Sequence, residues 1–116
     1  MYSVKASTAF QRDVRKLQKA YPRTKQDLEE LLNRLESGHL DGSAIKGFGR
    51  SVFKVRVPSS DQRRGKRGGF RVLYYVVTKD GLIYLLTIYA KSRQEDIRVE
   101  EIESLIRELE VHINRV

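Results

Sequence analysis

The sequence of 116 residues contains no cysteine. This absence excludes a disulfide framework and a thiolate metal site. The sequence also lacks an apolar run of about 18 residues, so it predicts no transmembrane helix. Residues 1–5 lack the apolar stretch of a signal peptide. We therefore expect one cytoplasmic domain that spans residues 1–116 and holds one hydrophobic core.

Positive charge is abundant and unevenly distributed. The net charge is +8 and the isoelectric point is about 9.9. Residues 95–110 carry seven acidic and two basic side chains. Residues 46–71 carry one acidic side chain, Asp61, and nine basic ones: Lys46, Arg50, Lys54, Arg56, Arg63, Arg64, Lys66, Arg67 and Arg71. A clustered positive field attracts polyanions, so nucleic acid is the favoured partner, with simple solubility as the alternative.

Two strand-like runs, residues 68–77 and 82–91, are rich in Val, Ile, Tyr and Thr. The Asp80-Gly81 pair between them predicts a β-hairpin. Both runs are apolar on both faces, which indicates central strands. Arg71 lies near the start of the first run, and Tyr89 and Lys91 lie at the end of the second. Antiparallel pairing predicts that these three side chains meet at one end of the sheet.

The remaining pattern predicts helices packed on this sheet. Residues 2–6 favour an edge strand, and residues 51–57 alternate so that Lys54 and Arg56 share the face opposite Phe53. Apolar spacing predicts a helix that Thr8 caps and Pro22 ends, a second from Thr24 to Gly38, and a third near the C-terminus. Loops are expected at residues 39–50 and 58–69. The order β-α-α-β-β-β-α predicts an α+β fold with a mostly antiparallel four-stranded sheet.

Five polar side chains are expected at one end or face of this sheet: Lys54, Arg56, Arg71, Tyr89 and Lys91. They include no carboxylate pair and no Ser-His-Asp set, and no ligand spacing indicates a metal or other cofactor. The set suits a phosphodiester. Arginine binds phosphate bidentately, lysine among other cations suits proton transfer, and tyrosine bonds a 2′-hydroxyl or stacks on a base. These residues alone leave RNA cleavage and RNA binding without catalysis equally open.

Three segments resemble toxins of the RelE/HigB type from bacterial type II toxin–antitoxin systems. They are Phe53-Lys54-Val55-Arg56, the Gly-Lys-x-Gly-Gly-x-Arg-Val-x-Tyr-Tyr run that starts at Gly65, and Tyr89-Ala90-Lys91-Ser92. The helix pair before them and the helix after them also fit, so the resemblance covers nearly the whole chain. It implies a RelE-like fold.

The resemblance also implies a function, a ribosome-dependent mRNA interferase. Such an enzyme cuts the mRNA codon in the 30S A site through attack of the 2′-OH on the adjacent phosphate. The implied catalytic residues are Lys54, Arg56, Arg71, Tyr89 and Lys91, without a metal. Side chains implied to hold 16S rRNA or mRNA are Arg64, Lys66, Arg67 and Arg93. The implied protein partner is a cognate antitoxin, often one with a helix-turn-helix.

The sequence departs from the family pattern in two places. Some members have a tyrosine just before or within the C-terminal helix and an arginine directly after the strand lysine. Here Ile97-Arg98-Val99 and Ser92 stand at those places. We expect Tyr89 to take the tyrosine's role, with Arg93 nearby. Two alternatives on the same fold are a ParE-like inhibitor of DNA gyrase and an RNA-binding module without catalysis.

Overall fold

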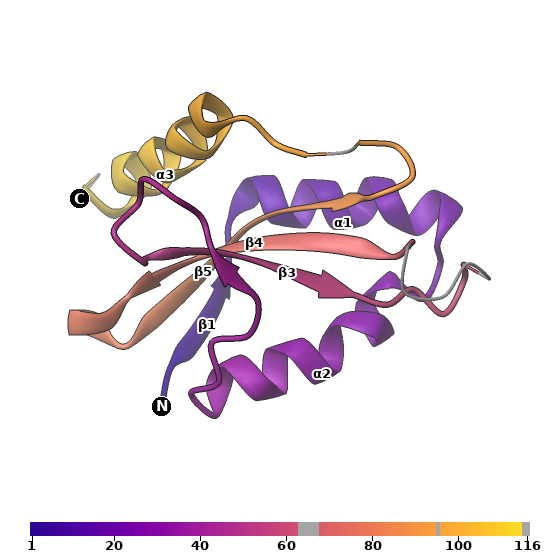
Figure 1. The fold of residues 1–116 in the computed structure, drawn as a ribbon, viewed down its shortest axis with the longest axis horizontal. Coiled ribbons are helices and arrows are strands. Elements are labelled where there is room, and N and C mark those ends of the chain that lie inside the picture. The colour runs from indigo at the N-terminus through magenta and orange to yellow at the C-terminus, as the bar shows by residue number, and fades with distance from the viewer. Residues whose placement is uncertain (63–67, 95, 115–116) are drawn as a thin grey trace.

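A computed structural model describes residues 1–62, 68–94 and 96–114, with the side chains of the last helix described as far as Leu109. The strands are β1 (Ser3–Ala6), β2 (Ser43–Ala44), β3 (Val52–Val57), β4 (Phe70–Val77) and β5 (Leu82–Ala90). The α-helices are α1 (Thr8–Ala20), α2 (Thr24–Glu36) and α3 (Val99–Asn114). The strands form one sheet in the order β1-β5-β4-β3-β2 (Figure 1). The predicted α+β class is confirmed.

The sheet has one strand more than the sequence predicts. β2 lies inside the expected loop of residues 39–50 and pairs antiparallel with β3, Ser43 opposite Lys54 and Ala44 opposite Phe53. Two residues are too short to show an alternating pattern, so the sequence contains no signal for this strand, although Ala44 packs against the core. β1 pairs parallel with β5, and the other strand pairs are antiparallel.

The predicted hairpin is β4 and β5. Its connection is longer than a two-residue turn, because residues Thr78–Asp80 form a 3₁₀ turn before Gly81 at φ 62°. The pairing of β4 with β5 shifts between Leu73, which faces Thr87, and Tyr74, which faces Leu85. This β-bulge switches the alternation of β5: before it Ile83 and Leu85 face the core under α1 and α2, and after it Ile88 and Ala90 do.

The helix caps differ from the prediction by one residue each. The hydroxyl of Ser7, and not that of Thr8, accepts the Phe10 N–H at 3.0 Å and caps α1. Ser7 also donates to the Leu86 carbonyl of β5 at 3.1 Å, a tertiary bond that selects it over its neighbour. Thr24 is the first residue of α2, and its hydroxyl donates to the Tyr21 carbonyl at 2.6 Å. Gly38, at φ 96°, follows α2 as predicted.

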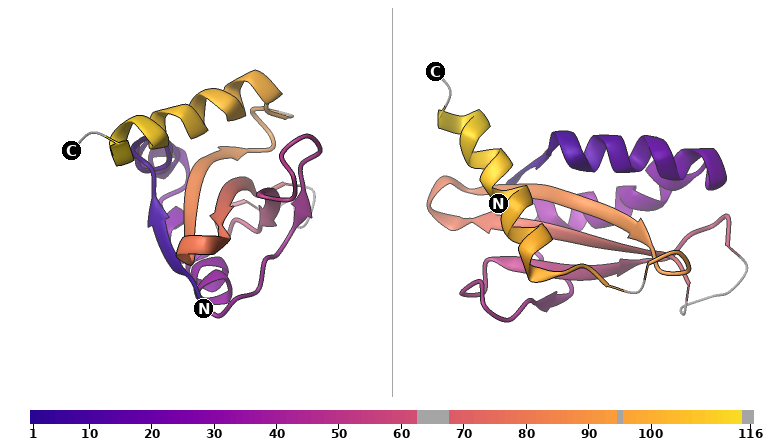
Figure 2. Two further views of the ribbon diagram at one scale, coloured as in Figure 1. Left: turned by 90° about the vertical axis from the view of Figure 1, so that its left-hand side faces the viewer. Right: turned by 90° about the horizontal axis from the view of Figure 1, so that it is seen from above.

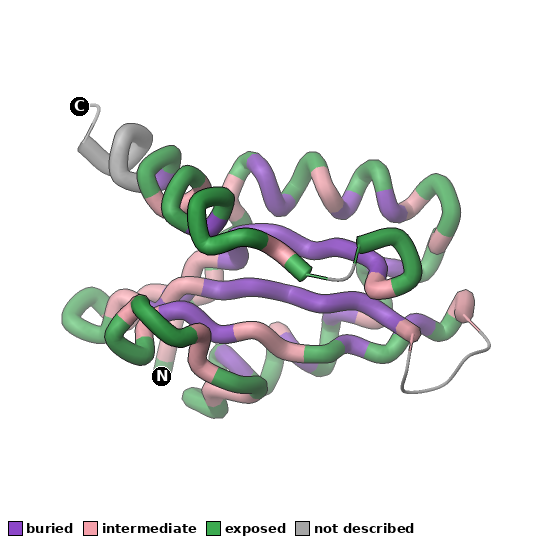
Figure 3. Tube along the Cα trace, turned by 45° about the horizontal axis from the view of Figure 1, so that its top comes forward, coloured by how far each residue is buried: buried purple, intermediate pink, exposed green. Residues whose placement is uncertain are grey.

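Two apolar layers fill the two faces of the sheet. α1 and α2 pack against one face, where β4 contributes Phe70, Val72, Tyr74 and Val76. α3 packs on the other face against Val52, Leu73 and Leu86 (Figure 2). Burial is greatest along the three central strands (Figure 3). Across the described residues, no helix has the length and apolar character needed to span a membrane.

α3 does not cover one end of the sheet face on which it packs. β3 ends, β4 begins and β5 ends at the right-hand side of Figure 1, whereas α3 runs toward the left-hand side, where both termini lie. The segment between β5 and α3 runs back over the sheet from that end. The polar side chains predicted to meet therefore lie at an end that α3 does not cover.

Candidate active site

Three predicted residues lie in one row across the sheet. Arg56 of β3 is directly opposite Arg71 of β4, and Arg71 is directly opposite Tyr89 of β5. Directly opposed residues in an antiparallel pair have Cβ atoms about 5 Å apart. Arg71 therefore stands between a second guanidinium and a phenol. The register confirms that antiparallel pairing brings Arg71 and Tyr89 together, as the sequence predicts.

A hollow of about 480 Å³ opens over this row. Four of the five predicted catalytic side chains line it, namely Lys54, Arg56, Arg71 and Lys91, together with Gly42, Ser43 and Val55. Tyr89 does not line it. Its side chain contributes instead to the core on the α3 face, and the residue is only 7 % exposed. Four cations thus line the hollow, and Tyr89 stands opposite Arg71 in the same row but outside the lining.

Arg71 is the most unusual residue of the site, because it is charged and only 6 % exposed. Its guanidinium donates to the carbonyls of Gly68 and Phe70, at 3.3 Å each. None of the described carboxylates forms an ion pair with it. Burial, with the charge of Arg56 in addition, lowers the pKa of Arg71 from its usual value. Arginine nevertheless stays charged in proteins, so the fold holds a desolvated cation that an anion would neutralise.

The Tyr89 hydroxyl is buried and has no hydrogen-bond partner among the described residues. Burial, together with the charge of the Asp96 carboxylate and its interaction with the hydroxyl, raises the pKa of Tyr89 to about 12, while Arg71 acts in the opposite direction. The phenol is therefore neutral at physiological pH and keeps a proton to donate. An unpaired buried hydroxyl costs free energy, so a partner supplied by a ligand would be favoured.

Asp96 belongs to the site, although the sequence reading did not select it. Its Oδ1 lies 3.2 Å from the Nζ of Lys54 and accepts the Ile97 N–H at 2.9 Å. The Ile97 N–H and the Lys54 ammonium hold the pKa of Asp96 below its usual value, and the Lys91 charge adds to this effect. Asp96 precedes α3 in the sequence, where an acidic residue reads as an ordinary helix-start signal. Its contact with β3 depends on the path of the chain after β5.

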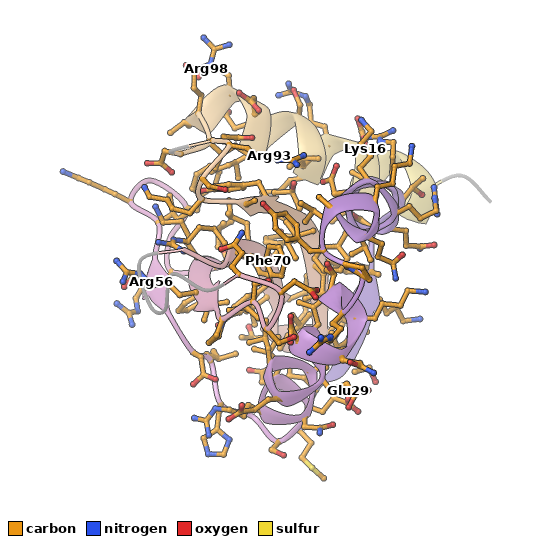
Figure 4. The ribbon with its side chains drawn as sticks, turned by 90° about the vertical axis from the view of Figure 1, so that its right-hand side faces the viewer. Lys16, Glu29, Arg56, Phe70, Arg93 and Arg98 are labelled. Carbon is orange, nitrogen blue, oxygen red and sulfur yellow. The ribbon has the colours of Figure 1, made fainter. Side chains whose placement is uncertain are left out.

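Arg93 lies away from the hollow. Its guanidinium sits over the ring of Tyr21, 5.6 Å from the centroid, and that ring packs edge-on against Phe70. The hydroxyl of Ser92, with contributions from Gln62 and Arg93, lowers the pKa of Tyr21. Figure 4 looks along the sheet from this end and shows Arg93 and Arg56 well apart. Arg93 therefore contacts Tyr21 and is not among the residues that line the hollow, and Tyr21 connects Arg93 with Phe70 at the start of β4.

The predicted loop residues Arg64, Lys66 and Arg67 lie outside the described residues. The ends of their loop are held in place. Asp61 accepts the Arg23 N–H at 2.8 Å, and the Gln62 side chain accepts the Gly69 N–H at 2.5 Å. Within the described part of the chain, no group of three His, Asp or Glu side chains is placed to hold a metal ion.

Gly42 sets the position of Lys54. An added Cβ at Gly42 would lie 2.3 Å from the Lys54 carbonyl oxygen, and the residue has φ +95°. We expect Gly42→Ala to lower the free energy of unfolding by about 1–3 kcal/mol and to weaken anion binding in the hollow. Urea unfolding and phosphate titration measure the two effects. Gly47→Ala is the control, since Gly47 has φ +99° but open space around it. Equal losses of anion binding in both variants would contradict the role of Gly42.

Fold and site together define a small basic α+β protein with a cationic hollow at one end of its sheet. The chain belongs to the RelE toxin family: residues 7–115 match the family described as the RelE toxin of the RelE/RelB toxin–antitoxin system. It is therefore a toxin of a toxin–antitoxin system, and the resemblance stated from the sequence is confirmed.

Two solved structures from E. coli share the fold. One is the free RelE toxin with two arginines replaced by alanine; it is 15 % identical, with a TM-score of 0.56, and the match covers 92 % of this chain and 96 % of that one. The other is the intact RelBE toxin–antitoxin complex; it is 18 % identical, with a TM-score of 0.53, over 76 % of this chain and 94 % of that one. These likenesses confirm the RelE-like fold.

Proposed function

We propose that this toxin is a metal-independent endoribonuclease that cuts mRNA in the ribosomal A site. The observation that carries the proposal is the row Arg56–Arg71–Tyr89, with Lys54 and Lys91 beside it at the same hollow. It supplies cations for a phosphodiester and a neutral phenol for proton transfer. RNA supplies its own nucleophile, the 2′-OH. The site therefore needs only to bind the phosphate, deprotonate the 2′-OH and protonate the leaving 5′-oxygen.

In the proposed reaction, the 2′-oxygen attacks the adjacent phosphorus and the bond from phosphorus to the 5′-oxygen breaks. Lys54 or Lys91 takes the proton of the 2′-OH. Arg71 and Arg56 neutralise the charge that develops on the non-bridging oxygens. Tyr89, next to Arg71 in the row, gives its proton to the leaving 5′-oxygen once RNA binding exposes its buried hydroxyl to the hollow. The products are a 2′,3′-cyclic phosphate and a 5′-OH.

Arg71 is suited to transition-state stabilisation by its burial. A guanidinium that is already desolvated and held by two carbonyls needs little reorganisation when charge develops on the phosphate. Arg56 is exposed and placed to meet the RNA first. In this proposal Arg56 captures the phosphate and Arg71 stabilises the transition state.

Contacts outside the hollow complete the proposal. Arg93, on the turn after β5, and the loop residues Arg64, Lys66 and Arg67 bind 16S rRNA or the mRNA backbone through charge. A cognate antitoxin, of the helix-turn-helix kind, neutralises the toxin in the cytoplasm. The E. coli RelBE complex supports an antitoxin partner by analogy. The chain acts as one domain, residues 1–116.

The test is an in vitro translation reaction with a defined mRNA, read by primer extension, with and without ribosomes. We expect cuts within the A-site codon only when ribosomes are present. Intact mRNA in both arms, with verified folded protein, would overturn the proposal. DNA breaks in cells that express the toxin, with intact mRNA, would instead identify a gyrase inhibitor.

A further inference from the structure

An anionic side chain is paired with one of the cations that line the hollow. Asp96 reaches from the segment before α3 and places Oδ1 3.2 Å from the Lys54 ammonium. The Lys91 charge also acts on this carboxylate. Two of the four cations that line the hollow therefore face Asp96, whereas no described carboxylate pairs with Arg71.

A phosphate and the Asp96 carboxylate compete for Lys54. If both lay against the same ammonium, two anions would be brought together beside a partly desolvated site, which is unfavourable. A phosphate that contacts Lys54 and Arg71 together must therefore displace the carboxylate from Lys54. The displacement is easy, because the Asp96 side chain is 63 % exposed and that of Lys54 is 35 % exposed. Ion pairs so exposed contribute little to stability.

The same aspartate touches the segment that leads into α3. Its Oδ1 accepts the Ile97 N–H, and the Gln94 side chain donates to the Asp96 carbonyl at 2.9 Å. Ile97 in turn packs against the core on the α3 face. Movement of the carboxylate away from Lys54 is thus linked to the segment between β5 and α3, which runs back over the sheet (Figure 1).

We propose that Asp96 is the resident counter-ion of the hollow, displaced from Lys54 by the phosphate of the RNA, and that it sets how tightly the site binds phosphate. The inference rests on the proposed function for the identity of the ligand as a phosphodiester. It adds a residue that opposes binding, where the other residues of the site favour it. Asp96 thus prevents the free site from holding stray phosphate tightly.

The experiment measures binding of inorganic phosphate to the full chain at constant ionic strength. NMR signals of the Arg71 side-chain N–H and the Lys54 amide follow the titration. Asp96→Asn removes the charge but keeps an oxygen that accepts the Ile97 N–H, so the segment keeps its geometry. Asp96→Glu keeps the charge. Glu101→Gln is the matched control, because it removes one negative charge from an exposed pair with Arg98, 3.6 Å away.

We expect Asp96→Asn to lower the Kd for phosphate about fivefold, and the other two variants to stay within about twofold of the parent protein. Phosphate binding by Asp96→Asn that is no tighter than binding by Glu101→Gln would overturn the inference. A titration in which the NMR signals of Arg71 and Lys54 do not shift in any of the proteins would also overturn it. This assay needs no ribosome. Tighter phosphate binding by Asp96→Asn without any mRNA cleavage by the parent protein would support the counter-ion and reject the nuclease.

Discussion

Arg71→Met is expected to reduce ribosome-dependent mRNA cleavage by at least about 1,000-fold while leaving the protein as stable as before, or more so. Loss of one preorganised transition-state donor typically costs about 100- to 1,000-fold, and Arg71 also binds the substrate phosphate. Stability moves the other way, because the guanidinium is buried without a described carboxylate partner. Replacement of a buried charge by an apolar side chain of similar length often stabilises a protein by about 1 kcal/mol or more.

The measurement pairs single-turnover cleavage on programmed ribosomes with urea unfolding. Arg98→Met is the control, since Arg98 is an exposed arginine before α3 whose side chain is 82 % exposed. It should change neither quantity substantially. A folded Arg71→Met protein with full cleavage would remove Arg71 from the site. A marked loss of stability would show that the guanidinium stabilises the fold, and that its burial does not lower the free energy of unfolding.

Tyr89→Phe is expected to lower the cleavage rate by about 100-fold or more, with unfolding free energy unchanged or slightly higher. The phenol is the neutral acid of the site, and positioned general acids contribute about 100- to 10,000-fold. The hydroxyl has no described partner in the free protein, so its removal leaves no buried group newly unpaired. Tyr84→Phe is the control, because Tyr84 lies near the start of β5, away from the row, and is paired with Tyr75. Full activity of Tyr89→Phe would assign the proton donor elsewhere.

The raised pKa of Tyr89 gives this variant a second readout. A group whose folded-state pKa exceeds its unfolded value favours folding below the unfolded pKa and loses that contribution as pH rises through the folded one. For Tyr89 the window runs from the usual pKa of 10.0 to about 12. Stability of the parent protein should fall across this window more steeply than that of Tyr89→Phe. Urea unfolding between pH 9 and 11 tests the difference.

The row at the centre of the site was predictable because it depends on local pairing. The Asp80-Gly81 turn joins two apolar runs, and antiparallel pairing then brings Arg71 near Tyr89. The alternation of residues 51–57 placed Lys54 and Arg56 on one face, and both line the same hollow. These inferences need only the strand period and the chain direction.

The parts that the sequence reading missed depend on contacts between distant segments. Asp96 meets Lys54 across 42 positions of the chain, and Arg93 meets the ring of Tyr21 at the end of α1. No periodicity reports such a meeting, because it follows from the direction that the chain takes after β5. The β-bulge opposite Leu73 is likewise invisible in the pattern, since Leu86 and Thr87 read as ordinary strand residues. The contact of Arg93 with Tyr21 was consequently not predicted.

The most direct test of the proposed chemistry uses a ribosome-bound mRNA whose A-site codon carries a single 2′-deoxynucleotide on the 5′ side of the cut. The chemistry requires the 2′-OH as nucleophile. The protein's own residues only bind the phosphate, deprotonate the 2′-OH and protonate the leaving 5′-oxygen. The deoxy mRNA should therefore remain intact in the presence of the toxin, while the matched all-ribose mRNA is cut to a 2′,3′-cyclic phosphate and a 5′-OH. Cleavage of the deoxy mRNA at the same bond would contradict this chemistry and require a nucleophile from the protein or from water.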